Sequence, residues 1–214
     1  MAVIIGVGPG IGAALARRFA AAGFDIALAA RSPGHLEPLA AELRAEGATA
    51  RWTAVDIADS AALRAAVEGF GVALGRIDVL HYNPSIYRPK DPLQLSVEEL
   101  LDDVRIGVGG LLTAVQAARP FLSAGARVTA TGSMAADRPS ASACSLGVQK
   151  AALRNLITSL DTTLKPDGIR AMSLTVRGVL KPDTPFAADR VAEALFEAAH
   201  TDGENWRTEI SYTG

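Results

Sequence analysis

The stretch that decides the fold lies near the start of the chain and reads Gly6-Val7-Gly8-Pro9-Gly10-Ile11-Gly12. An apolar run at residues 2–5 precedes it and predicts a buried strand. An alanine-rich run at residues 13–22 follows it and predicts a helix, because Leu15 and Phe19 lie one helical turn apart. The glycines therefore occupy a strand-to-helix turn.

A turn of this kind is suited to binding an anion. The first N–H groups of a helix have no partner within the helix, and glycines let a phosphate approach that backbone closely. The spacing Gly8-x-Gly10-x-x-Ala13 fits the general fingerprint of dinucleotide-binding folds. A tight turn without a ligand is the alternative for so short a motif, so the remaining sequence has to decide between them.

The composition fits a single domain over residues 1–214. Of the 214 residues, 49% are hydrophobic and 21% are charged, which allows a sizeable core. A net charge of −2 supplies no polybasic surface, and no apolar stretch is long enough to span a bilayer, so we expect neither a nucleic-acid nor a membrane partner. With one cysteine, Cys144, and no recognisable signal sequence before the first strand, we expect a cytoplasmic protein without an internal disulfide.

Predicted strands and helices alternate along the rest of the chain. Asp59 or Ser60 is expected to cap one helix, and Ser96, with Glu98 and Glu99 in the first turn, another. This alternation predicts an α/β protein with a Rossmann-type, doubly wound parallel sheet between two layers of helices, and ligands beyond the carboxyl ends of the strands. The further strands are expected at 26–30, 48–55, 77–81, 127–131, 169–176 and 208–212, and the helices at 36–46, 59–74, 96–122, 145–164 and 187–200.

Several landmarks follow the glycine turn in a recognisable order. Asp56-Ile57 ends the third predicted strand, Asn83 follows the fourth, Ser133 follows the fifth, and Lys150 lies in the next helix. In this order, and with the glycine spacing Gly6-x-x-x-Gly10-x-Gly12, the sequence resembles the short-chain dehydrogenase/reductase family over nearly its whole length. The resemblance implies a nicotinamide dinucleotide held by Gly6, Gly8, Gly10, Ile11, Gly12, Asp56, Ile57, Asn83, Lys150 and Thr184.

The resemblance also places catalytic groups, and two of them differ here. Ser133 is similar to the catalytic serine, and Lys150 to the lysine of the Tyr-x-x-x-Lys motif. The family's tyrosine, which protonates the developing alkoxide, corresponds to Leu146, and its helical asparagine corresponds to Gly107. Because a leucine has no proton to give, the resemblance implies a divergent member lacking the catalytic tyrosine and asparagine.

Other groups are candidates for the missing proton donor. Tyr82 and Tyr87 lie at and after the end of the fourth predicted strand, Ser133 has a hydroxyl, and Lys150 could hold a water. For the two tyrosines, the alternative is that their rings pack under the loop. Gly107, Gly109 and Gly110 within the predicted helix 96–122 indicate close packing or a local break near the same pocket.

The end of the second strand bears on the choice of coenzyme. Ala30-Arg31-Ser32 carries no carboxylate that would repel a 2′-phosphate. Arg31 can pair with that phosphate and Ser32 can donate to it, so we favour NADP(H) over NAD(H). The alternative is a solvated arginine that begins the next helix.

Two other interpretations of the sequence carry less support. Ser145 in Ala143-x-Ser145-x-Gly147, with Asp161, Asp183 and His200 following, resembles a hydrolase nucleophile elbow, but residues 137–140 are poor strand material. No histidine or cysteine has metal-ligand spacing, and Cys144 fits a small buried hydrophobe better than a nucleophile.

We therefore interpret the chain as an NADP(H)-binding oxidoreductase that reduces a carbonyl or imine with a non-standard proton donor. The alternative is a non-catalytic NADP(H)-binding sensor or scaffold. The substrate is unknown, and the passage from Arg177-Gly178 to the last helix predicts a shortened substrate loop. The resemblance implies a homodimer or homotetramer formed through the helices that end near Leu122 and Leu164.

Overall fold

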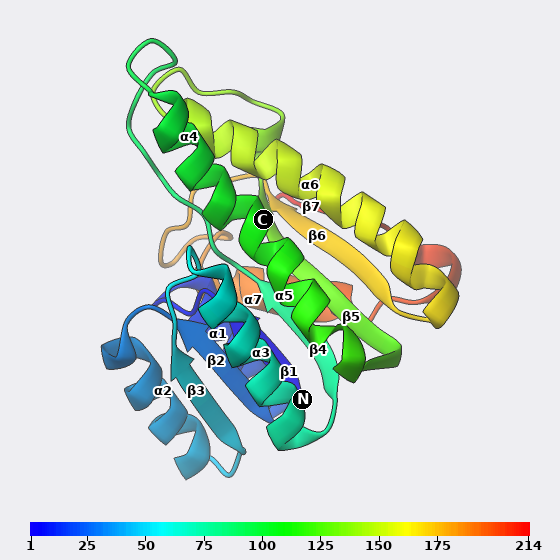
Figure 1. The fold of residues 1–214 in the computed structure, drawn as a ribbon. Helices are drawn as coiled ribbons and strands as arrows, with labels where there is room; N and C mark the ends of the chain where they lie inside the picture. The colour runs from blue at the N-terminus through cyan, green and yellow to red at the C-terminus, as the bar shows by residue number, and fades with distance from the viewer.

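Seven parallel strands form the centre of the structure, a computed structural model that describes residues 1–214 (Figure 1). Their order in the sheet is β3-β2-β1-β4-β5-β6-β7, so the chain reverses its winding between β1 and β4. In such sheets ligands bind at this switch point, beyond the carboxyl ends of the strands. The strands are β1 Ala2–Ile5, β2 Ile26–Ala30, β3 Ala50–Ala54, β4 Ile77–Tyr82, β5 Leu122–Ser133, β6 Arg170–Val176 and β7 Glu209–Tyr212.

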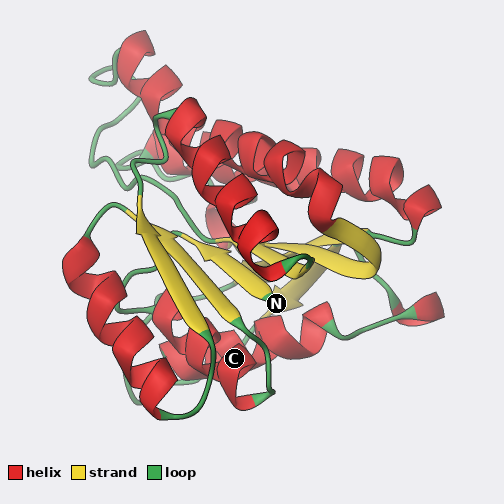
Figure 2. Cartoon of the chain, turned by 60° about the horizontal axis from the view of Figure 1, so that its bottom comes forward, coloured by secondary structure: helices red, strands yellow, loops and turns green.

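Helices cover both faces of the sheet (Figure 2). One face packs under α1, α2 and α7 and the other under α3, α5 and α6, with cores of similar size that contain 26 and 28 buried residues. The predicted three-layer, doubly wound α/β fold is therefore confirmed. None of the helices combines the length and the apolar character needed to cross a bilayer. The helices are α1 Ile11–Ala21, α2 Pro33–Ala45, α3 Ser60–Leu74, α4 Val97–Val104, α5 Gly110–Ala118, α6 Cys144–Leu164 and α7 Ala188–Ala199.

The predicted helix caps are present. The Asp59 carboxylate accepts hydrogen bonds from the N–H groups of Ala61 and Ala62 at the start of α3. At the start of α4, the hydroxyl of Ser96 accepts from the N–H of Glu99, whose carboxylate accepts from the N–H of Ser96. These bonds satisfy N–H groups that have no partner inside the helix.

The segment predicted as one helix over 96–122 is broken. A π-helical turn, Arg105–Gly109, separates α4 from α5. A Cβ on Gly107 would lie 2.5 Å from Oε1 of Gln149, and a Cβ on Gly110 would overlap the hydroxyl of Tyr82. The glycines thus serve both expected purposes, because they admit neighbouring side chains at a place where the helix changes its winding.

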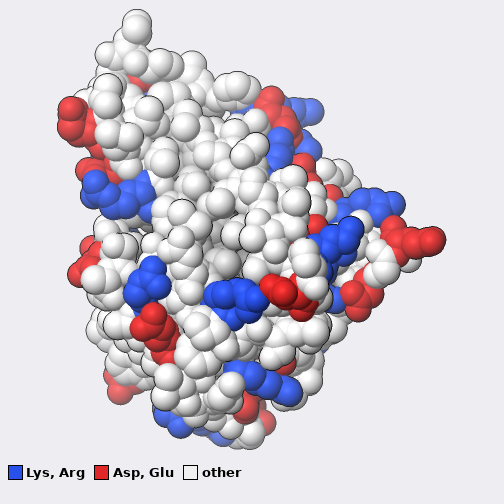
Figure 3. Space-filling view, turned by 45° about the vertical axis from the view of Figure 1, so that its right-hand side comes forward, with Lys and Arg blue, Asp and Glu red and all other residues white.

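Charged side chains of both signs are interspersed over the face shown in Figure 3. Many basic groups have an acidic partner close by: Arg17 binds Glu42 with two hydrogen bonds, and Arg18 binds Glu193 in the same way. Such exposed pairs contribute about 1 kcal/mol or less each.

Two glycines in α3 offer a matched test of the packing. A Cβ on Gly69 would meet no atom within 4 Å, whereas a Cβ on Gly71 would overlap the ring of Phe121. We expect Gly69→Ala to raise the free energy of unfolding by up to about 1 kcal/mol, because alanine favours the helix. Gly71→Ala should lower it by about 1 to 3 kcal/mol through overpacking. Urea unfolding of both variants measures the difference, and equal effects would contradict the packing of Phe121 against α3.

Candidate active site

The glycine turn joins β1 to α1 and contains two kinds of glycine. Gly6 has φ +85°, and a Cβ on it would lie 2.7 Å from the ring of Pro84. A Cβ on Gly12 would lie 2.9 Å from the carbonyl oxygen of Gly6 and from Cα of Val7. At Gly8 and Gly10, by contrast, nothing lies within 4 Å of the place where a Cβ would be. The fold requires glycine at positions 6 and 12, whereas Gly8 and Gly10 border open space.

One cavity, of about 260 Å³, lies on the β2 and β3 side of the turn. Gly6 and Gly8 form one wall of it. The carboxylate of Asp56 accepts from the N–H of Ala58, which fixes the chain where it leaves β3. This cavity brings together the predicted residues Arg31, Ser32, Asp56 and Ile57, and it adds His35 from the first turn of α2.

A second cavity, of about 350 Å³, lies on the β4 to β6 side of the same turn. Gly6 and Gly8 line both cavities, so the turn forms a wall of each. Asn83 donates from Nδ2 to the carbonyl oxygen of Gly6, at 2.9 Å. This cavity brings together the predicted residues Gly6, Gly8, Gly10, Ile11, Gly12, Asn83, Ser133 and Lys150, and Leu146 lines it as well.

Lys150 lies at the inner end of the second cavity and is almost fully buried. Its ammonium group donates to the backbone carbonyl of Thr131, at 2.7 Å. Burial disfavours the charged form and lowers the pKa of Lys150 to about 8. The side chain can therefore hold or release a proton near neutral pH.

Ser133 ends β5 and faces the same cavity. Its hydroxyl oxygen accepts from the N–H of Ala135, at 3.2 Å. Because this bond uses only the oxygen, the hydroxyl hydrogen remains available for donation to a bound molecule. Leu146 contributes an apolar wall beside Ser133 and Lys150, one helical turn before the lysine.

The two tyrosines that the sequence suggested as proton donors lie elsewhere. Tyr82 ends β4 with its ring completely buried, and its hydroxyl donates to the backbone carbonyl of Ile106. Burial raises the pKa of this phenol. Tyr87 is 68% exposed and lines neither cavity. The structure corrects the expectation for both, because Tyr82 belongs to the core and Tyr87 to the outer surface of its loop.

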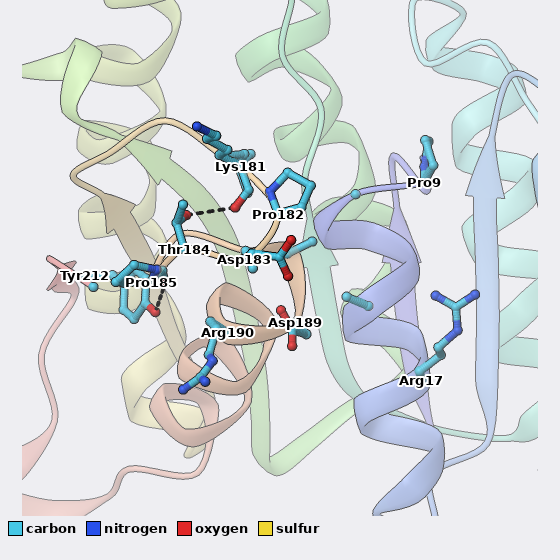
Figure 4. A pocket seen from close by; sticks show the side chains of 16 residues that line it. Pro9, Arg17, Lys181, Pro182, Asp183, Thr184, Pro185, Asp189, Arg190 and Tyr212 are labelled. Carbon is cyan, nitrogen blue, oxygen red and sulfur yellow. Dashed lines mark hydrogen bonds between the residues drawn. The ribbon is translucent and has the colours of Figure 1, made fainter.

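Thr184 lies in a third and larger cavity of about 1000 Å³, between α1 and the loop that leads to α7 (Figure 4). Its hydroxyl donates to the carbonyl of Lys181 at 2.8 Å, so it is directed into its own loop. Thr184 thus lies in a different cavity from Ser133 and Lys150, and its contact with the coenzyme stays a prediction. Gly10 and Leu180 line both this cavity and the second one, so the two are neighbours.

Sequence reasoning did not identify Gln149, which holds the loop that lines the first cavity at Ile86. Its buried amide bonds both backbone groups of Ile86, with Oε1 accepting from the N–H and Nε2 donating to the carbonyl, each at 3.0 Å. Arg88 holds the same loop by two hydrogen bonds to the buried carboxylate of Asp103. No sequence signal marks these contacts, which join residues 63 and 15 positions apart in the chain.

The structure does not assemble a hydrolase triad around Ser145. No strand leads directly into Ser145, because β5 ends at Ser133 and Ser145 lies buried in the first turn of α6. Asp161 is occupied by two hydrogen bonds from Arg170, and Nδ1 of His200 lies 2.7 Å from the carbonyl of Phe196. No group of three or more His, Cys, Asp or Glu side chains has an arrangement that could hold a metal ion.

Known proteins with this fold include enzymes and nicotinamide-dinucleotide complexes. A short-chain dehydrogenase from Burkholderia cenocepacia J2315, solved in complex with NADP, is 28% identical, with a TM-score of 0.90 over 98% of this chain and 94% of that chain. A blue fluorescent protein from a metagenomic library, solved in complex with NADPH, is also 28% identical, with a TM-score of 0.89 over 98% of this chain and 94% of that chain. A cis-4-hydroxycyclohexanecarboxylate dehydrogenase from Sinomonas cyclohexanicum is 30% identical over 90% of this chain and 77% of its own length.

Two other curated oxidoreductases match over shorter segments, so this chain spans about half of their lengths, 46% and 45%. Residues 1–193 match the short chain dehydrogenase family, which is most of the chain. The protein belongs to the short-chain dehydrogenase family.

Proposed function

We propose that this chain is an NADP(H)-dependent oxidoreductase that acts on a carbonyl or imine without a tyrosine as proton donor. The observation that carries the proposal is that two cavities share Gly8 as a lining residue. One of them contains Arg31 and Ser32, and the other contains Ser133 and Lys150. The first offers groups for a phosphorylated ribose, and the second offers groups for proton transfer.

The residues present fit the dinucleotide. Open space at Gly8 and Gly10, beside the N-terminus of α1, leaves room for the phosphates to approach the backbone. Arg31 and Ser32 would hold the 2′-phosphate, Asp56 and Ile57 would border the adenine, and Lys150 and Asn83 would lie at the nicotinamide half. NADP(H), when bound, supplies or accepts the hydride.

Ser133 and Lys150 are the proposed source of the proton in place of a tyrosine. The free hydroxyl hydrogen of Ser133 can be donated to the oxygen or nitrogen of the reacting group. Lys150, with a pKa of about 8, can supply that proton directly, through Ser133 or through a water. Leu146 forms an apolar side of the space and takes no part in the transfer.

A non-catalytic NADP(H)-binding protein is the second candidate, and the apolar side chain of Leu146 favours it. An assay separates the two: NADPH oxidation is followed with a panel of aldehydes, ketones and imines, after NADPH binding has been established by fluorescence. Consumption by the wild-type protein supports the oxidoreductase. Binding without consumption, together with turnover by Leu146→Tyr, supports the second candidate. A folded protein that does not bind NADPH would exclude both.

Arg31 provides a test of the coenzyme. We expect Arg31→Ala to reduce the preference for NADPH over NADH at least about tenfold, because a charge-assisted bond to the 2′-phosphate is lost. NADH binding should change little. Arg51→Ala, which removes an exposed arginine on β3, serves as the matched control. Fluorescence titrations with both coenzymes measure the ratio of the two affinities. An unchanged ratio in Arg31→Ala would show that Arg31 does not bind the 2′-phosphate.

The proposed assembly is a homodimer or homotetramer, and the proposed substrate loop is short. Leu101 on α4, Leu112 on α5 and Val148 on α6 are exposed apolar side chains on the helices that the family resemblance assigns to subunit contacts. Leu153, in contrast, is buried against the sheet. The loop from Arg177 to α7 closes on itself, since the N–H of Lys181 donates to the carbonyl of Phe186. Such a loop leaves the second cavity open to a large substrate.

A further inference from the structure

A histidine lies inside the sheet, in a layer where the neighbouring side chains are mostly apolar. His81 on β4 is fully buried, and its side of the sheet carries Val79 and Met172 in the core beneath α1 and α7. Nδ1 of His81 lies 2.8 Å from the hydroxyl oxygen of Thr129, and Nε2 lies 3.2 Å from that of Thr131. Burying an imidazole is costly unless both nitrogens are paired, and here both have a hydroxyl partner.

The bonds lead to the glycine turn. The hydroxyl of Thr131 lies 2.8 Å from Oδ1 of Asn83, and Nδ2 of Asn83 lies 2.9 Å from the carbonyl oxygen of Gly6. Nδ2 also lies 3.6 Å from the place where a Cβ on Gly12 would be. The amide of Asn83 therefore lies between the two ends of the turn, and a continuous chain of hydrogen bonds connects it to His81.

The chemistry of the groups fixes the direction of every bond. The carbonyl of Gly6 only accepts, so the amide nitrogen of Asn83 faces it and Oδ1 faces Thr131. Thr131 has one hydroxyl hydrogen and donates it to Oδ1, so its oxygen accepts from His81, which must carry its hydrogen on Nε2. In a neutral imidazole, Nδ1 of His81 then carries no hydrogen and accepts from Thr129.

We propose that His81 is a positioning residue for the dinucleotide turn, acting through Thr131 to hold Asn83 in the one orientation that binds Gly6. The role rests on the proposed NADP(H) site. A neutral imidazole with its hydrogen on Nε2 is the only form of His81 that pairs with both threonines in these directions. Burial and the nearby Lys150 lower the pKa of His81 to about 3, so the neutral form persists near neutral pH.

Two pairs of variants test the hydrogen-bond relay that runs from His81 through Thr131 to Asn83, with NADPH affinity as the measurement. Thr131→Val and His81→Leu each interrupt it, whereas Thr131→Ser keeps the hydroxyl and His81→Gln keeps a donor toward Thr131. We expect the first member of each pair to bind NADPH at least about tenfold more weakly than the wild type, and the second to stay within about threefold of it. Circular dichroism establishes which variants are folded.

A second measurement does not depend on the cofactor. Nitrogen-15 NMR of the wild-type protein without coenzyme reports which imidazole nitrogen carries the hydrogen. We expect Nε2 of His81 to carry it, with no titration between about pH 5 and about pH 9, well above the folded pKa. A hydrogen on Nδ1, or a titration near neutral pH, would overturn the proposal even if a variant failed to fold.

The two measurements separate this proposal from the proposed function. The wild-type protein could show the Nε2 form but bind no NADPH. That result would contradict both the proposed function and the role of His81 at the dinucleotide turn, and only the hydrogen-bond arrangement would stand. A wild-type protein that binds NADPH, with folded Thr131→Val binding it as tightly as Thr131→Ser, would overturn the positioning role alone. Weaker binding by Thr131→Val and His81→Leu, with rescue by their conservative partners, supports it.

Discussion

Replacing Gly8 with alanine is expected to weaken NADPH binding at least about tenfold without lowering the free energy of unfolding. Nothing in the protein lies within 4 Å of the place where the new methyl group would be, and the backbone at Gly8 does not have a positive φ. Gly8 lines both cavities, so the methyl group would border the space proposed for the coenzyme. If the phosphates of the coenzyme approach this backbone, the methyl group keeps them away. Fluorescence titration measures the affinity and urea unfolding measures the stability.

Gly12→Ala is the counterpart to this variant. Its Cβ would lie 2.9 Å from the backbone of both Gly6 and Val7, and neither can swing aside as a flexible side chain could. We therefore expect a loss of about 1 to 3 kcal/mol in the free energy of unfolding as well as weaker binding.

If Gly8→Ala bound NADPH as tightly as the wild type, the coenzyme would not pass over the turn as proposed.

Replacing Lys150 with methionine is expected to reduce turnover at least about 100-fold, within the range for loss of a general acid. Methionine occupies the buried position without a charge, so the fold should tolerate it. In the wild type, reduction requires the protonated lysine, so the rate should fall as the pH rises through the pKa of about 8. This dependence should be absent from the residual activity of Lys150→Met.

Lys165→Met is the control for this prediction, because Lys165 is exposed and lies in a 3₁₀ turn after α6. We expect it to keep both the rate and the pH dependence of the wild type. Rates of NADPH oxidation measured from about pH 6 to about pH 10 cover the titration of Lys150. The same fall in rate near pH 8 in Lys150→Met would show that another group supplies the proton.

The sequence was sufficient to predict the fold and several residues that line the two cavities. Alternating strand and helix patterns are local signals, and they placed all seven strands in the order of the chain. The end of a parallel strand is also a predictable place for a site, which is why Arg31, Asp56, Asn83 and Ser133 were found beside the two cavities.

The sequence was not sufficient where a side chain is directed by distant contacts. Tyr82 and Asn83 are neighbours in the chain, but alternate residues of a strand point to opposite faces, and Gly110 leaves room for the tyrosine ring in the core. The bonds of Gln149 to Ile86, and of His81 to Thr131, each connect segments about 50 or more residues apart. Residue patterns of short range contain no information on such pairs.

A crystal structure of the protein with NADPH tests the central claim most directly. The account predicts the 2′-phosphate at Arg31 and Ser32, the two bridging phosphates over Gly8 and Gly10, and the nicotinamide ring in the cavity lined by Ser133, Leu146 and Lys150. Coenzyme bound instead in the larger cavity beside Thr184, or with its nicotinamide away from Ser133 and Lys150, would contradict it.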